Sequence, residues 1–134
     1  MGMEVVVACP KGCGPEKSVL ARAEELAKGS GGRIQVVHDP GEAVEGADVL
    51  YTDVWVSMGQ EKGAKLKERK FRAYQVNSKL VRRAGDECSV MHCLPAHRGL
   101  EITDDVIEGE RSIVWQQAEN KMHSARAVLA AFLS

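Results

Sequence analysis

Five short apolar runs are spaced along the chain. They cover residues 4–9, 33–38, 48–54, 89–94 and 112–116. Their apolar character is nearly continuous instead of alternating, which is typical of strands that are buried on both faces of a parallel sheet. We therefore predict a β-strand for each run.

Helical patterns fill the stretches between these runs. Apolar positions recur at helical spacing in residues 15–28 and 118–133. Asn77 and Thr103 are suited to cap two shorter helices that begin beside them. The stretch 59–70 is strongly charged and has few apolar positions, so it is either an exposed helix or a loop.

Strand and helix alternate from one end of the chain to the other, and neither an internal repeat nor a linker divides it. This alternation predicts an α/β fold, a doubly wound three-layer sandwich around a five-stranded parallel sheet. At 134 residues the chain is long enough to bury one core without disulfides or a metal ion. We expect residues 1–134 to form a single Rossmann-like domain.

Charge and cysteine content argue against several classes of function. Eighteen Lys and Arg stand against nineteen Asp and Glu, for a formal net charge of −1. This balance argues against binding to nucleic acid or to a membrane through bulk electrostatics, and no apolar run predicts a membrane span or a signal peptide. The four cysteines are interpreted as reduced thiols of a cytoplasmic protein, and their spacing predicts neither a metal site nor a cofactor.

Polar and reactive side chains gather where three of the predicted strands end. Asp53 and Ser57 follow the third run, His92 and Cys93 lie in the fourth, and Glu119 follows the fifth. In an open α/β sheet, ligands bind outside the carboxyl ends of the strands. The sequence therefore predicts a binding site at this edge of the sheet.

The segments that carry these side chains resemble the signature segments of ornithine carbamoyltransferases. They read YTDVWVSMG at 51–59, MHCLPAHRG at 91–99 and QAEN at 117–120. Within the wider carbamoyltransferase family, Cys93 points to ornithine as the substrate, because aspartate carbamoyltransferases carry proline there. The resemblance runs over essentially the whole chain and implies the ornithine-binding half of such an enzyme, without the half that holds carbamoyl phosphate.

The resemblance implies roles in ornithine binding and catalysis. Asp53 and Cys93 would be the catalytic pair that orients the δ-amine of ornithine and helps to deprotonate it. Asp53, Ser57 and Met58 would bind ornithine, with the segment around Ser57 closing over the substrate. A thiolate at Cys93 would require nearby cations or N–H groups that lower its pKa.

The resemblance also implies contacts with carbamoyl phosphate. Cys93, Leu94 and Lys121 would face this second substrate. Lys121 departs from the family pattern, which has arginine directly after Glu-Asn. Lysine keeps the positive charge but lacks the planar fork that grips phosphate with two hydrogen bonds.

Each of these side chains also has a structural alternative. Asp53 can cap the turn after its strand, and Ser57 can be an ordinary helix N-cap. Cys93 can be a buried small apolar residue. His92 points to the opposite face of its strand from Cys93, which argues against a shared zinc ion and for a hydrogen-bonded structural histidine. Arg98 can anchor its loop without touching substrate.

The resemblance implies that the first strand of the parent domain is not in this sequence. Removing strand 1 from the order 3-2-1-4-5-6 leaves an order that renumbers as 2-1-3-4-5, the flavodoxin-like arrangement. We expect the first run to pair with the third in this way. The alternative is an unfilled slot with open strand edges, which invites domain swapping or dimerisation, so we expect the fragment to be either a monomer or a swapped dimer.

Two functions from different classes remain. The first is a fragment of a transferase that carbamoylates ornithine with carbamoyl phosphate, giving citrulline and phosphate in arginine biosynthesis. We expect this chain alone to be inactive, because the Ser-x-Arg-Thr-Arg motif of the carbamoyl phosphate domain is absent from it. The second is a non-catalytic binding module, or an engineered fold model, with flavodoxin-like architecture.

Overall fold

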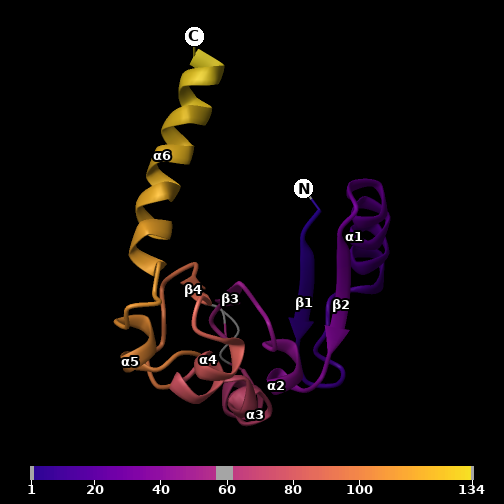
Figure 1. The fold of residues 1–134 in the computed structure, drawn as a ribbon, viewed down its shortest axis with the longest axis vertical. Helices are drawn as coiled ribbons and strands as arrows, with labels where there is room; N and C mark the ends of the chain where they lie inside the picture. The colour runs from indigo at the N-terminus through magenta and orange to yellow at the C-terminus, as the bar shows by residue number, and fades with distance from the viewer. Residues whose placement is uncertain (1, 57–61, 134) are drawn as a thin grey trace.

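The computed structural model describes residues 2–56 and 62–133. It alternates strands with helices, as the sequence predicts, but its strands form two parallel pairs (Figure 1). In chain order the elements are β1 (Glu4–Ala8), α1 (Lys17–Ser30), β2 (Arg33–Val37), α2 (Pro40–Ala43), β3 (Val49–Thr52), α3 (Ala64–Phe71), η1 (Arg72–Tyr74), α4 (Ser78–Ala84), β4 (Ser89–His92), α5 (Asp104–Ile107) and α6 (Val114–Leu133).

Residues 4–37 form a β–α–β unit. β1 and β2 pair in parallel, with Glu4 opposite Arg33 and Ala8 opposite Val37. Gly31 adopts a left-handed conformation at the end of α1 (φ 73°), which glycine does without steric cost. A Cβ on Gly32 would lie 2.6 Å from a backbone oxygen of Met3, so glycine is needed where β2 begins beside β1.

The second parallel pair consists of β3 and β4. Its register places Val49 opposite Ser89 and Thr52 opposite His92. The chain between these strands contains α4, whose N-cap Asn77 accepts a hydrogen bond from the backbone N–H of Leu80 at 3.1 Å. The predicted capping role of Asn77 is thereby confirmed.

The predicted fifth strand at residues 112–116 is wrong. Only Ser112 forms a parallel bridge, with Val90 of β4, and α6 already begins at Val114. The backbone N–H of Gln117 donates to the carbonyl of Ile113 at 2.9 Å, a helical hydrogen bond. Residues that favour helix follow Val114, so α6 begins inside the apolar run. Among the described strands, the run also has only β4 beside it, which gives it little to pair with as a strand.

The predicted order 2-1-3-4-5 is also not found in the described part of the chain. β1 pairs with β2 alone, and β3 pairs with β4 alone. Figure 1 shows the β1–α1–β2 unit beside the β3–β4 pair, with α6 extending away from the other side. Val5 of β1 and Val49 of β3 remain 42% and 47% exposed, so no packed layer of the described residues covers these side chains.

Contacts near the end of β2, not along the strands, join the first unit to the rest. The Tyr74 hydroxyl donates to the carbonyl oxygen of His38 at 2.6 Å. Arg83 of α4 forms an ion pair with Glu45, just after α2, at 2.6 Å. The first contact holds the chain directly after β2, and the second holds it after α2; within residues 2–56 and 62–133 no strand pairs with the outer edge of β1.

The hydrophobic core lies around β4 and the helices that follow it. Val90, Ile102 and Val114 are wholly buried within one cluster of apolar side chains. α1 contributes no buried residue, and α6 contributes only Val114. Among the helices in residues 2–56 and 62–133, none is long and apolar enough to cross a membrane. The core therefore supports the end of β4, where the candidate site lies.

Candidate functional site

The site is built where β3 and β4 end side by side. Thr52 and His92 are paired in the parallel register, so the next residues, Asp53 and Cys93, leave the two strands next to each other. The thiol of Cys93 donates to Oδ1 of Asp53, with Sγ 2.9 Å from the oxygen. The structure therefore brings together the two side chains that the sequence analysis selected.

The pKa values of this pair move in opposite directions. Hydrogen bonds from the Cys93 thiol and from the Val54 N–H lower the pKa of Asp53, and the nearby charge of Lys121 acts in the same sense. Burial, followed by the hydrogen bond to the Asp53 carboxylate, raises the pKa of Cys93. At neutral pH the pair is therefore a carboxylate and a neutral thiol. A thiolate at Cys93 would need a lowered pKa, and its surroundings raise the pKa instead.

Lys121 reaches the same edge from α6. Its ammonium group donates a hydrogen bond to the backbone carbonyl of Cys93. It also contributes to the lowered pKa of Asp53. A cation thus lies beside the Asp53–Cys93 pair, on a side chain that is itself exposed.

Leu94 continues the chain in an unusual conformation. Its φ is 57°, in the left-handed region that non-glycine residues rarely occupy, and the following Leu94–Pro95 peptide is cis. Its backbone N–H donates to Nδ1 of His92 at 2.8 Å. The N–H is therefore engaged, and the carbonyl is the backbone group that Leu94 can offer to a ligand.

His92 and Arg98 have structural contacts. His92 is buried on the face opposite Cys93, and its Nε2 lies 3.2 Å from Oε1 of Glu101, which confirms the prediction of a hydrogen-bonded histidine. Arg98 pairs with Asp104 at 3.0 Å and with Glu108. Arg98 therefore anchors its loop in this structure.

Two residues at the site were missed by the sequence analysis. Glu101 is wholly buried, and its place between the apolar residues Leu100 and Ile102 was the available signal. The side chain of Gln117 accepts from the N–H of His92 at 3.0 Å and donates to the hydroxyl of Tyr51 at 3.1 Å. Its position in the QAEN segment was noted, but a contact to the strands was not predicted.

Ser57 and Met58, predicted to bind ornithine, lie outside the described residues. The chain that leads to them is fixed by Trp55, which is buried and packs on Phe71 with 6.2 Å between ring centroids. In the described ranges, no three His, Cys, Asp or Glu side chains are grouped so that they could hold a metal ion.

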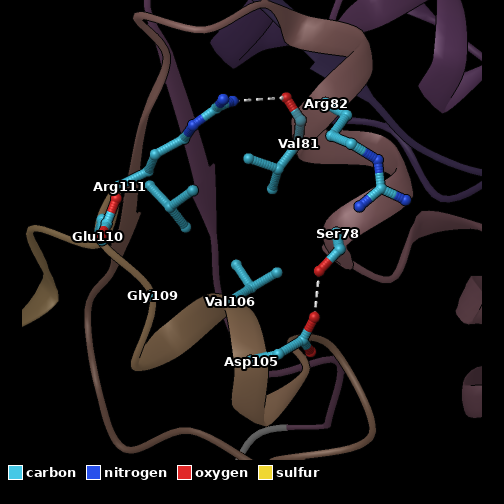
Figure 2. Close-up of a pocket in the computed structure, with 9 residues that line it drawn as sticks. Ser78, Val81, Arg82, Asp105, Val106, Gly109, Glu110 and Arg111 are labelled. Carbon is cyan, nitrogen blue, oxygen red and sulfur yellow. Dashed lines mark hydrogen bonds between the residues drawn. The ribbon is translucent and has the colours of Figure 1, made fainter.

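A cavity of about 240 Å³ lies elsewhere, between α4 and α5 (Figure 2). Val81 and Val106 point into it, and Ser78 and Asp105 form a hydrogen bond across its rim. Arg111 donates to the carbonyl of Gly85 and so stabilises the end of α4. Because these polar groups already have partners, we assign no ligand to this cavity.

Comparison with known proteins gives a consistent result. The family model described as aspartate/ornithine carbamoyltransferase, Asp/Orn binding domain, matches residues 1–132. The ornithine carbamoyltransferase of Pyrococcus horikoshii is 53% identical over 133 residues, which cover 99% of this chain and 42% of that protein. That of Hyperthermus butylicus is 51% identical and is covered over 43% of its length.

Solved structures show the same fold. Ornithine carbamoyltransferase from Pyrococcus furiosus superposes with a TM-score of 0.90 at 53% identity, over 96% of this chain and 41% of that one. An acetylornithine transcarbamylase solved with acetylcitrulline gives a TM-score of 0.84 at 28% identity, over 97% of this chain and 40% of that one.

The chain spans about two fifths of the length of these relatives, 42% for the Pyrococcus horikoshii enzyme. Within that span the match is continuous, and it includes the ends of β3 and β4 that carry Asp53 and Cys93. The chain therefore belongs to the aspartate/ornithine carbamoyltransferase family and corresponds to its Asp/Orn binding domain.

Proposed function

We propose that this chain is part of the ornithine-binding domain of an ornithine carbamoyltransferase. That enzyme would transfer the carbamoyl group of carbamoyl phosphate to the δ-amine of ornithine, giving citrulline and phosphate in arginine biosynthesis. The observation that carries the proposal is the contact between the Cys93 thiol and the Asp53 carboxylate at the carboxyl ends of two adjacent parallel strands.

Asp53 is assigned to hold the nitrogen that reacts. The δ-ammonium of ornithine is a cation, and a carboxylate with a lowered pKa stays ionised and attracts it. The Cys93 thiol, by donating to Oδ1, orients this carboxylate and leaves its other oxygen for ornithine. Cys93 acts here as a neutral hydrogen-bond donor, since its pKa is raised by burial.

The δ-ammonium first releases one proton to solvent, which frees the lone pair of the nitrogen, and a second, surplus proton is released when this nitrogen forms its new bond. Its lone pair forms a bond to the carbamoyl carbon while the bond from that carbon to the phosphate oxygen breaks, and phosphate leaves with the electron pair. Because the lowered pKa of Asp53 makes it a weak base, we assign the surplus proton to the departing phosphate, which is a stronger base. Asp53 keeps the nitrogen aligned throughout.

Carbamoyl phosphate would meet three groups of this chain. The carbonyl of Leu94 would accept from the carbamoyl amide group, because the Leu94 N–H is bound to His92. Cys93 would lie beside the carbamoyl carbon, and Lys121 would contribute positive charge toward the phosphate. Ser57 and Met58 would close on the amino-acid end of ornithine, as the resemblance of their segment implies.

The chain alone is proposed to be catalytically inactive. It covers 42% of the Pyrococcus horikoshii enzyme, so more than half of a relative's length has no counterpart in it. The open edges of β1 and β3 support the view that residues 1–134 are an incomplete single domain, as a monomer or a swapped dimer. Its free cysteines fit a reducing compartment, and we place it in the cytoplasm.

A chimera tests the proposed function. This chain would replace the matching 42% of the Pyrococcus horikoshii ornithine carbamoyltransferase, to which it is 53% identical. We expect citrulline from ornithine and carbamoyl phosphate, and a loss of about 10²–10⁴-fold in kcat/KM for Asp53→Asn. Asp48→Asn is the matched control, since Asp48 lies at the amino end of β3 and should have little effect.

The outcomes are distinct. A chimera that folds and assembles like the parent enzyme but makes no citrulline would contradict the transferase assignment. In that case the non-catalytic binding module would become the better description. Equal loss of activity in the Asp53 and Asp48 variants would contradict the role given to Asp53.

A further inference from the structure

A fully buried carboxylate lies behind the site. Glu101 has no exposed surface, and its Oε1 accepts a hydrogen bond from the backbone N–H of His97 and lies 3.2 Å from Nε2 of His92. Burying a carboxylate is costly unless hydrogen bonds compensate. The function proposed above gives Glu101 no role.

The contacts of His92 define which of its ring nitrogens carries a proton. The backbone N–H of Leu94 lies 2.8 Å from Nδ1, and a backbone N–H can only donate. Nδ1 is therefore the acceptor, and the proton of the neutral ring is on Nε2, where it donates to Glu101. Glu101 thus selects the tautomer that leaves Nδ1 free to hold Leu94.

This hydrogen bond acts on a strained residue. Leu94 has a φ of 57°, which a leucine adopts only when its surroundings hold it there. Cys93 lies between His92 and Leu94, so the bond from Leu94 to the His92 ring closes a short loop around the Cys93 backbone. On the opposite face of the strand, the Cys93 thiol reaches Asp53 at 2.9 Å.

We propose that Glu101 and His92 are positioning residues, which hold the Leu94 N–H and thereby direct the Cys93 thiol onto Asp53. The catalytic meaning of this arrangement rests on the function proposed above. The arrangement itself is independent of turnover and can be measured on this chain.

Two substitutions of His92 test the contacts of its two ring nitrogens separately. In His92→Asn, the amide oxygen can stand near the position of Nδ1 and accept from Leu94, while the contact to Glu101 is lost. In His92→Gln, the amide group can stand near Nε2 and donate to Glu101, while Leu94 loses its acceptor. Glu101→Leu removes the acceptor for Nε2 of His92, whereas Glu101→Gln keeps one and serves as its conservative variant.

The measurement is the alkylation rate of Cys93 by iodoacetamide as a function of pH, followed on the Cys93 peptide by mass spectrometry. Only the thiolate reacts, so in the unchanged chain a thiol held on Asp53 reacts slowly at neutral pH. In His92→Gln and in Glu101→Leu we expect the rate at pH 7 to rise about tenfold for each unit by which the thiol pKa falls. His92→Asn and Glu101→Gln should stay close to the unchanged chain.

A matched control separates positioning from general loss of packing. Val90 lies on the same strand and the same face as His92 and is also wholly buried, so Val90→Ala should destabilise the fold. Its Cys93 pH profile should not move. A profile for His92→Gln that coincides with that of the unchanged chain, or an equal shift in Val90→Ala, would overturn the proposal.

The same variants in the chimera link the arrangement to function. There His92→Gln should lower kcat more than it raises KM for ornithine, because it misplaces a group without removing a binding contact. If the chimera makes no citrulline, the thiol measurement still decides whether Glu101 and His92 position Cys93. The two proposals therefore fail separately.

Discussion

The side chain of Gln117 accepts a hydrogen bond from the backbone N–H of His92 at 3.0 Å, and so it occupies a position that a neighbouring strand would fill. Its amide nitrogen donates to the hydroxyl of Tyr51 on β3 at 3.1 Å. One residue in the first turn of α6 thus ties together the ends of β3 and β4. The missing fifth strand is replaced at this point by a side chain.

Removing this side chain should destabilise the fold. Gln117→Ala leaves the partly buried N–H of His92 without its partner, which we expect to lower the free energy of unfolding by about 1–3 kcal/mol. Urea unfolding followed by circular dichroism measures this change. Gln116→Ala is the control, since Gln116 is exposed on the same helix turn, and its effect should stay within about 0.5 kcal/mol. Equal effects would show that the contact is unimportant.

The lowered pKa of Asp53 predicts a pH dependence with a definite sign. A carboxyl whose pKa is lower in the folded than in the unfolded chain stabilises the fold above the unfolded value, and this stabilisation disappears as the pH falls through the folded value. The stability advantage of the unchanged chain over Asp53→Asn should therefore shrink below about pH 4. Urea unfolding between pH 7 and 2.5 tests this, and an advantage that grows in acid would contradict it.

The location of the core predicts which side chains stabilise the fold when they are intact and destabilise it when they are shortened to alanine. Ile102 is wholly buried in the main cluster, so Ile102→Ala should lower the free energy of unfolding by about 2–5 kcal/mol. Val19 lies exposed on α1, and Val19→Ala should change it by less than about 0.5 kcal/mol. Thermal and urea unfolding give both values. A larger effect at Val19 would place the core elsewhere.

The open edge of β1 predicts self-association. Val5 lies on this strand, which pairs with β2 alone, and a lysine there should oppose pairing with another chain. If the chain dimerises through this edge, Val5→Lys should weaken the dimer at least tenfold in size-exclusion chromatography with light scattering. Val19→Lys on α1 adds the same charge away from any strand edge and should leave the dimer unchanged.

Lys121 offers a gain-of-function test in the chimera. Arginine has the planar fork that binds phosphate with two hydrogen bonds, so Lys121→Arg should lower the KM for carbamoyl phosphate severalfold. Lys121→Ala should raise it by about tenfold or more, since the positive charge beside Cys93 is lost. Steady-state citrulline production measures both. An unchanged KM in the alanine variant would remove Lys121 from the phosphate site.

Local sequence signals predicted the four strands well, because apolar runs bounded by Pro10, Pro40 and Pro95 are short and distinct. They did not predict the order of the strands, which depends on what lies beside β1 and β3. The run at 112–116 was misassigned because β-branched composition says nothing about whether a second neighbour is present to extend the ladder.

The contact between Asp53 and Cys93 could be foreseen, because parallel neighbours that end at the same register place their next residues together. The protonation of Cys93 could not, since it depends on burial and on the distance to Asp53. Glu101 was missed for a related reason. The partners of this carboxylate come together only once the chain between it and His92 has folded back.

The uneven distribution of buried side chains has a consequence for motion. Among residues 2–43, none belongs to the main cluster, so the β1–α1–β2 unit has little to hold it when its backbone hydrogen bonds open. Its amide hydrogens should exchange with solvent well before those of β4. The rim formed by β3, β4 and α6 can then keep its geometry while the first unit opens and closes, and the Asp53–Cys93 pair would be preserved during such excursions.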